Sequence, residues 1–263
     1  MRKNKAYLGQ IGGDWFDDFV FMSQEPLKNM GFEIIKYDED NLEDTLLCWP
    51  LDIEKDVIIG SVEACRAFFE GCGIETPKYL GYPEELKGFL GRNVSNLKFS
   101  DVYDIPTPFF IKPAEGVKKF TGALIDDHKS LQLFKDFDGV VDSDPVILST
   151  PVEFLSEYRC FVHEGELKGI QHYAGDFKLF PNVRTIENMI KVYKSANCAY
   201  TLDVGVTPSY GTLLVEVNDM WAIGQYGFDA KTYTLMCVRR MREIGRQAKG
   251  ETEPLWKKLK QHG

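Results

Sequence analysis

Three oxygen-bearing side chains lie in two strand-like segments late in the sequence. Asp203 belongs to the segment YTLDVGV, and Glu216 and Asn218 belong to TLLVEVND. Side chains two residues apart in an extended strand project from one face, so Glu216 and Asn218 share a face. If the turn TPSYG joins the two segments as antiparallel strands, Asp203 lies beside them. Burying such groups is costly unless something cationic meets them.

These three side chains offer a cation only oxygen ligands. Carboxylate and amide oxygens suit a hard divalent ion, Mg²⁺ before Ca²⁺, with nucleotide phosphates completing the coordination shell. The alternative is a pair of strand ends with solvated polar residues. The shared face and the apolar residues that flank it favour the magnesium site.

A lysine and a short loop in the middle of the chain could bind phosphates. Lys112 ends the apolar segment PFFIK and is followed by Pro113 and the loop AEGVKKFTG. A lysine in this place can reach a phosphate as a point charge, and the backbone N–H groups of the loop could cover the same phosphates. Taken alone the signal is weak, because a lysine at a strand end is usually a surface residue.

The segment VEFLSEYRCFV adds residues that could hold the rest of a nucleotide. Glu153 and the backbone around it could face an adenine edge, and Glu157 could accept hydrogen bonds from ribose hydroxyls. Arg159 could hold a transferred phosphoryl group. An ordinary Glu–Arg pair across two strands of a sheet surface is the alternative.

The composition excludes several classes of protein. The net charge of −9 over 263 residues argues against a nucleic-acid partner, which requires a concentrated basic surface. No apolar run approaches the roughly 18 residues of a membrane helix, and the first residues lack the apolar core of a signal peptide. The six cysteines have no metal-like spacing and read as reduced thiols. We therefore expect a cytoplasmic protein with no membrane partner.

The elements that must position these residues change in character along the chain. Strand-like and helix-like runs alternate over residues 1–105, which predicts an N-terminal α/β layer with parallel strands. Residues 106–247 predict an antiparallel-rich α+β domain, with a hairpin at Glu164–Gly165 and a final helix near residues 229–247. We divide this domain into subdomains 106–155 and 156–247. A polar tail covers residues 248–263.

The order of these motifs resembles the ATP-grasp superfamily, which includes the D-alanine–D-alanine ligases and the ribosomal-protein glutamate ligases. The resemblance rests on FFIKPAEGVKKFTG, VEFLSEYRCFV, LDVGV and LLVEVND, and covers about residues 106–228. It implies a fold in which two α+β subdomains clasp ATP, preceded by an α/β domain.

The resemblance also implies roles for single residues. Lys112 would bind ATP phosphates, Glu153 and Phe154 would line the adenine pocket, and Glu157 would hold the ribose. The implied Mg²⁺ ligands are Asp203, Glu216 and Asn218.

The sequence departs from the family pattern in two places. The family places a second phosphate-binding lysine before the first strand of the fold, where this chain offers Arg92 and Lys98. We select Arg92, as in a clade where arginine replaces that lysine. The phosphate loop is also short, with Gly116 and Gly122 as its only glycines.

The implied reaction activates a carboxylate. ATP phosphorylates the acceptor, and an amine displaces phosphate to give an amide and ADP, while Mg²⁺, Lys112, Arg92 and Arg159 neutralise charge. The substrates would be small-molecule, peptide or protein carboxylates and amines, and a homodimer remains one option. Tyr173, Lys178, Arg184 and the segment WAIGQYGF fall where an acceptor pocket could lie, although core packing explains the aromatic residues of that segment equally well.

Three alternatives remain open from the sequence. An ATP-grasp kinase would transfer phosphate to a hydroxyl and would need no amine. A nucleotide-binding protein would keep the site without turnover. A structural α/β domain would leave Asp203, Glu216 and Asn218 as a coincidence.

Overall fold

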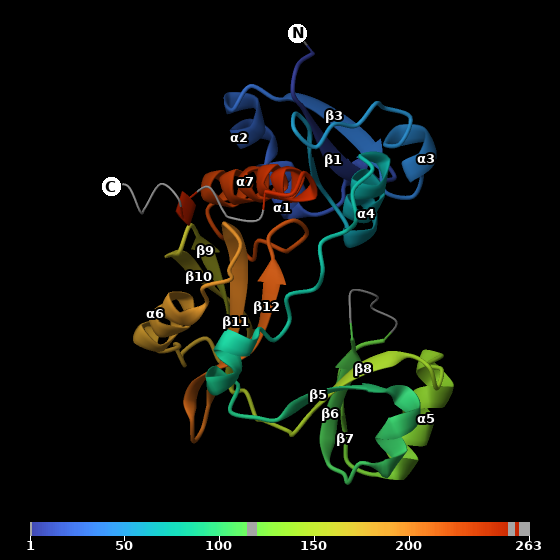
Figure 1. The fold of residues 1–263 in the computed structure, drawn as a ribbon, viewed down its shortest axis with the longest axis vertical. Helices are drawn as coiled ribbons and strands as arrows, with labels where there is room; N and C mark the ends of the chain where they lie inside the picture. The colour runs from blue at the N-terminus through green and yellow to red at the C-terminus, as the bar shows by residue number, and fades with distance from the viewer. Residues whose placement is uncertain (1, 115–119, 252–255, 258–263) are drawn as a thin grey trace.

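The computed structural model describes residues 2–114, 120–251 and 256–257. Within them the chain forms three sheets with helices packed against them (Figure 1). The N-terminal sheet comprises β1 (Lys5–Ile11), β2 (Asp14–Trp15), β3 (Glu33–Asp38) and β4 (Val57–Ile59). β1 is parallel to β3 on one side and to β4 on the other, as the alternation of strands and helices predicts. The helices of this part are α1 (Asp18–Met22), α2 (Gln24–Asn29), α3 (Leu42–Thr45) and α4 (Val62–Gly71).

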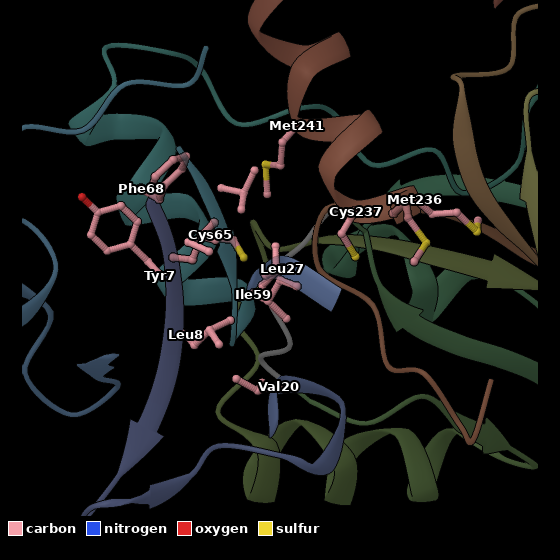
Figure 2. Packing of buried hydrophobic residues seen from close by; sticks show 14 of the residues in the cluster. Tyr7, Leu8, Val20, Leu27, Ile59, Cys65, Phe68, Met236, Cys237 and Met241 are labelled. Carbon is pink, nitrogen blue, oxygen red and sulfur yellow. The ribbon is translucent and has the colours of Figure 1, made fainter. Parts of the chain in front are cut away.

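The last helix, α7 (Ala230–Ala248), packs between the N-terminal sheet and the third sheet (Figure 1). It begins where the Asp229 side chain accepts a hydrogen bond from the Thr232 N–H, which caps the helix. Met236 and Met241 of α7 join a buried cluster with Tyr7 and Leu8 of β1 (Figure 2). A helix that we assigned to the second region therefore completes the core of the first.

The second sheet has the strand order β5-β8-β6-β7 and is antiparallel throughout, with α5 (His128–Asp138) beside it. We placed the start of this subdomain at residue 106, whereas β5 lies upstream of that residue. The domain limits otherwise stay predictions. Residues 115–119 of the predicted phosphate loop, Gly116 among them, lie outside the described residues, as does most of the predicted tail. The strands are β5 (Val94–Lys98), β6 (Phe109–Pro113), β7 (Ala123–Ile125) and β8 (Pro145–Ser149).

The third sheet, in the order β10-β9-β11-β12, is also antiparallel and has two unlike faces. One face is apolar and is covered by α6 (Val183–Val192), with Tyr200, Leu202 and Val204 of β11 in its core. The alternate residues of β11 include Thr201 and Asp203 and project from the other face. The predicted hairpin is confirmed, because Glu164 and Gly165 adopt the positive φ angles of a tight turn. The strands are β9 (Ser156–His163), β10 (Glu166–Gly175), β11 (Ala199–Thr207) and β12 (Gly211–Asp219).

An extended linker, residues 74–82, runs from α4 to the 3₁₀ helix η1 (Glu84–Phe89) and passes β12 (Figure 1). The Gly81 N–H donates to the Val217 carbonyl at 3.0 Å, and the Val217 N–H donates back to Gly81 at 2.8 Å. The linker is thereby fixed along the edge of the third sheet. A second 3₁₀ helix, η2 (Phe99–Asp104), follows β5. None of the helices in the described residues is long and apolar enough to cross a membrane.

Candidate active site

A row of polar residues crosses all four strands of the third sheet on the face away from α6. Gln171 of β10 lies opposite Arg159 of β9, Arg159 lies opposite Asp203 of β11, and Asp203 lies opposite Glu216 of β12. Directly opposite residues of an antiparallel pair project from one face, so these four side chains are neighbours. The predicted pairing of Asp203 with Glu216 is confirmed. The next pair on this face of the sheet is Thr201 with Asn218.

Asp203, Glu216 and Asn218 form one hydrogen-bonded group. The Asn218 Nδ2 atom donates to Asp203 Oδ2 at 3.1 Å and to Glu216 Oε1 at 3.0 Å. In the described part of the chain no three His, Cys, Asp or Glu side chains are placed to hold a metal by themselves. Two carboxylates and one amide, completed by phosphate oxygens and water, nevertheless match the way Mg²⁺ binds in proteins. The donor set therefore fits Mg²⁺, provided that Asn218 turns its amide oxygen toward the ion.

Arg159 is tied to the buried carboxylate of this group. Its Nε and Nη2 atoms donate to the two oxygens of Asp203 at 2.9 and 2.7 Å, and Nη1 donates to the Gly224 carbonyl at 3.2 Å. Burial alone would lower the pKa of the Arg159 guanidinium, but the bond and the charge of Asp203 raise it. Arg159 thus stays charged within the polar row, where it can stabilise an anion.

Lys112 reaches the same row from the second sheet. Its Nζ atom lies 2.5 Å from Glu216 Oε2 and donates to the Tyr79 hydroxyl at 3.1 Å. Burial works against both charges, yet the Glu216 carboxylate raises the pKa of Lys112, and the Lys112 ammonium lowers the pKa of Glu216. Both groups are therefore ionised at neutral pH, and each cation of the site neutralises one carboxylate.

Arg92 also lies at this site, but its guanidinium is occupied by backbone oxygens. Nη1 donates to the carbonyls of Leu90 and Leu214 at 3.0 and 2.7 Å, and Nη2 donates to Val215 at 2.7 Å. Three of its five N–H donors are thus used to fasten the chain before β5 to β12. The other candidate, Lys98, is exposed on β5 opposite Pro145. A phosphate-binding role for Arg92 stays a prediction.

The residues predicted to hold the nucleoside lie between β8 and β9 and along β9. Glu153 is exposed and lines a cavity of about 350 Å³ together with Gly91. The Phe154 ring packs on Gly205 of β11, where a Cβ atom would come within 2.0 Å of it. Glu157 Oε2 accepts a hydrogen bond of 2.7 Å from the Tyr173 hydroxyl. The nucleotide-binding roles of these three residues stay predictions.

In the segment that follows β12, some residues belong to the core and one borders the site. The Phe228 ring stacks on buried Phe161 at 4.3 Å, and the Trp221 ring packs edge-on against Phe69 of α4. Tyr226 differs from both, because its ring is 50% exposed and stacks on Tyr173 at 5.4 Å.

Tyr226 also has a φ of +50°, which is uncommon for a residue with a side chain, and the Arg159 guanidinium lies 4.8 Å from its ring centre. Lys178 and Arg184 are exposed. Arg184 belongs to α6, which covers the opposite face of the sheet, so it does not join the polar row.

Sequence reasoning missed several residues that contact this site. Tyr79 and Tyr82 of the linker lie beside Lys112, with the Tyr82 ring centre 4.9 Å from its Nζ atom. Gln171 completes the polar row on β10. The motif KYLGY that contains both tyrosines has no spacing typical of a binding site, whereas Gln171 could have been found by pairing the predicted hairpin residue by residue.

Residues 89–236 match the family model described as ATP-grasp domain, R2K clade family 2. The matched segment exceeds half of the chain and contains every predicted site residue. The chain belongs to the ATP-grasp superfamily. The resemblance inferred from the motif order is thereby confirmed, as are the fold class and the pair of ligands that ATP-grasp enzymes use, ATP and Mg²⁺.

Solved structures show the same ATP-grasp architecture at low sequence identity. D-alanine–D-alanine ligase from Bacillus anthracis, complexed with ATP, aligns with a TM-score of 0.56 and 12% identity over 94% of this chain and 99% of that one. D-cycloserine synthetase aligns with a TM-score of 0.59 and 11% identity over 90% and 99%.

N5-carboxyaminoimidazole synthetase from Staphylococcus aureus gives a TM-score of 0.56 and 13% identity over 90% and 78%. At these identities the structures establish the shared fold. A sequence comparison with curated proteins gives no significant match.

Proposed function

We propose that this ATP-grasp protein is an ADP-forming ligase that joins a carboxylate to an amine through an acyl phosphate. The polar row carries the proposal. Two carboxylates and an amide on one sheet face meet a cation from each of two sheets, Lys112 and Arg159. Such an arrangement suits phosphoryl transfer, in which positioning and charge neutralisation supply most of the rate enhancement.

The side chains of the row and Lys112 have separate roles in the proposed reaction. Asp203, Glu216 and Asn218 would hold Mg²⁺, which would supply neutralisation of phosphate charge. Lys112 exchanges Glu216 for phosphate oxygens and keeps the terminal phosphate in place. Arg159 stabilises the charge that develops on the transferred group and on the acyl phosphate, because its guanidinium is fixed by Asp203 before the reaction begins.

The amine then attacks the acyl phosphate, which forms the amide bond and releases phosphate and a proton. The ligases and synthetases among the structural relatives support this reaction type by analogy. The substrate pair is a carboxylate and an amine on small molecules, peptides or proteins. A cytoplasmic location and a homodimer stay predictions from the sequence.

The acceptor side of the site is the exposed surface next to Arg159. The half-exposed Tyr226 ring, the Tyr173 ring and the Gln171 side chain all border it. Aromatic faces and an amide would orient a substrate by stacking and by hydrogen bonds. We therefore place the acceptor carboxylate between this surface and the polar row.

A coupled assay tests the reaction directly. The protein is incubated with ATP, Mg²⁺ and pairs of amino acids or short peptides, ADP release is followed, and products are identified by mass spectrometry. The proposal expects an amide product with one ADP and one phosphate per bond, and no turnover by the Asp203→Asn variant. A stable phosphorylated product without free phosphate would identify a kinase instead, and ATP binding without turnover across the screen would contradict catalysis.

A further inference from the structure

The linker between the N-terminal sheet and the rest of the molecule reaches into the nucleotide site through one hydroxyl group. The Tyr79 hydroxyl donates to Glu216 Oε2 at 2.8 Å and accepts a hydrogen bond of 3.1 Å from Lys112 Nζ. It therefore touches the predicted phosphate-binding residue of the second sheet and a predicted metal ligand of the third sheet at once. Glu216 also accepts a hydrogen bond from Asn218, but Asn218 lies on the same strand, so this bond does not link the two sheets.

The backbone of the linker is shaped to hold this ring. Gly81 is hydrogen-bonded to Val217 in both directions, one residue beyond Glu216 on β12. Gly81 has a φ of +51°, and a Cβ atom at this position would come within 2.5 Å of the Tyr79 ring. Only glycine permits both the conformation and the contact, so the ring folds back over its own backbone toward Glu216.

The hydroxyl group satisfies both of its neighbours through one oxygen atom. Its proton is donated to the Glu216 carboxylate, which leaves the oxygen lone pairs for the Lys112 ammonium. The Tyr82 ring closes the other side of Lys112.

We propose that Tyr79 is a positioning residue of the ATP site, whose hydroxyl holds Lys112 and Glu216 in the geometry that MgATP requires. This inference rests on the proposed function. Lys112 and Glu216 must exchange each other for a phosphate and for Mg²⁺ when the nucleotide binds. A shared neutral partner keeps both side chains in place during that exchange, so less side-chain freedom is lost on binding.

The test is the Tyr79→Phe variant, which keeps the ring and removes only the hydroxyl. Its affinity for ATP is measured by calorimetry over a series of Mg²⁺ concentrations. We expect MgATP to bind about tenfold more weakly, as for the loss of one hydrogen bond to a charged group. The melting temperature without nucleotide should stay near that of the wild type. Tyr103→Phe is the matched control, because its hydroxyl donates one hydrogen bond to Gln132 away from the site.

Two readouts separate positioning from general support of the fold. The loss of affinity should be larger with Mg²⁺ than without it, because Tyr79 acts partly through a metal ligand. In the Lys112→Met background, which should still bind MgATP weakly, addition of Tyr79→Phe should cost less affinity than it does in the wild type, since residues that act through a common partner are not additive.

Each other outcome has a definite meaning. If Tyr79→Phe binds MgATP like the wild type, the inference is wrong and the proposed function stands. If the variant melts earlier without nucleotide, or loses affinity equally with and without Mg²⁺, Tyr79 is a structural residue and the inference is also wrong. If the wild-type protein itself binds no MgATP, the proposed function fails first, and the inference fails with it.

Discussion

Two sets of ion pairs each include a residue near the end of β12, and the two sets have different roles. The first set contains Glu216 with Lys112. The second contains Asp219, whose two oxygens accept from Arg240 of α7 at 2.7 Å each, while Arg240 also donates to Glu243 at 2.9 Å.

The two sets differ in exposure and in what they connect. The side chains of Lys112 and Glu216 are 17% and 23% exposed, and they join two sheets at a surface that ligands can reach. The side chains of Arg240, Asp219 and Glu243 are 3%, 6% and 2% exposed, and they fasten α7 to the third sheet. The Glu243 carboxylate also accepts from the Cys198 N–H, so Arg240 and the backbone together satisfy the two buried carboxylates.

Pairing alone therefore does not identify a functional charge. A fully buried network has no room to exchange partners, and removal of one member leaves an unpaired buried charge. A partly exposed pair can exchange its partner for a ligand at small energetic cost. The distinction predicts that substitutions in the first set impair function and those in the second impair folding.

The largest effect is expected from Glu216→Gln, which keeps the shape and removes the charge. Turnover should fall by orders of magnitude, because metal neutralisation of the transferred group is worth several kcal/mol. The free energy of unfolding without nucleotide should change by no more than about 1 kcal/mol, since the Lys112 ammonium stays partly exposed to solvent and keeps its hydrogen bond to the Tyr79 hydroxyl. MgATP should no longer raise the melting temperature as it does for the wild type. If the variant unfolded without ligand, Glu216 would be a structural residue like those of the second set.

The corresponding substitution in the second set is Arg240→Met, which removes the cation from the buried network of Arg240, Asp219 and Glu243. Denaturant titration should show a loss of about 3–5 kcal/mol, because Asp219 and Glu243 remain buried without their cation. The fraction that still folds should bind MgATP with unchanged affinity, since α7 does not contact the polar row through Arg240. If the variant bound MgATP more weakly at unchanged stability, the two sets would not differ in role as we expect.

A smaller effect is expected from Lys112→Met. Nucleotide affinity should fall at least about tenfold, since a charge-assisted contact to phosphate is lost. Stability without ligand should fall by about 1 kcal/mol or less, because Tyr79 and Asn218 still donate to Glu216. Calorimetry with ATP and Mg²⁺ measures the first quantity and denaturant titration the second. Unchanged affinity would assign the phosphate contact to another basic residue.

The smallest effect is expected for the pH dependence of stability that His163 causes. Burial first, and next the charges of Lys168 and Arg239, lower the pKa of His163 against the opposing pull of Glu164 and Glu166. The unfolded chain therefore binds a proton that the folded protein resists, so stability should fall as the pH drops below about 6.5. His163→Gln should flatten this part of the curve of unfolding free energy against pH. A curve of the same slope would show that His163 does not titrate in this range.

Part of the polar row was predictable from local patterns. Residues two apart on a strand share a face whatever the rest of the fold does, which places Glu216 beside Asn218. A short turn between two apolar runs makes them neighbouring antiparallel strands, which brings Asp203 close to Glu216. The exact pairing depends on a β-bulge, because the register set at the turn would place Val215 opposite Asp203 and the shift between Asp203 and Val204 places Glu216 there instead. The order of four motifs along the chain was enough to indicate the ATP-grasp family, because that order reflects the order of the strands.

Contacts between distant segments were decided only by the tertiary structure. Lys112 and Glu216 are 104 residues apart, Tyr79 reaches Glu216 across 137 residues, and Arg242 of α7 donates to the Ile53 carbonyl across 189. Nothing in the local spacing of these residues links them, because each pairing depends on how two sheets and a helix pack together. Hydrophobic burial is non-directional and brings such segments together, and only the packed arrangement determines which charge meets which.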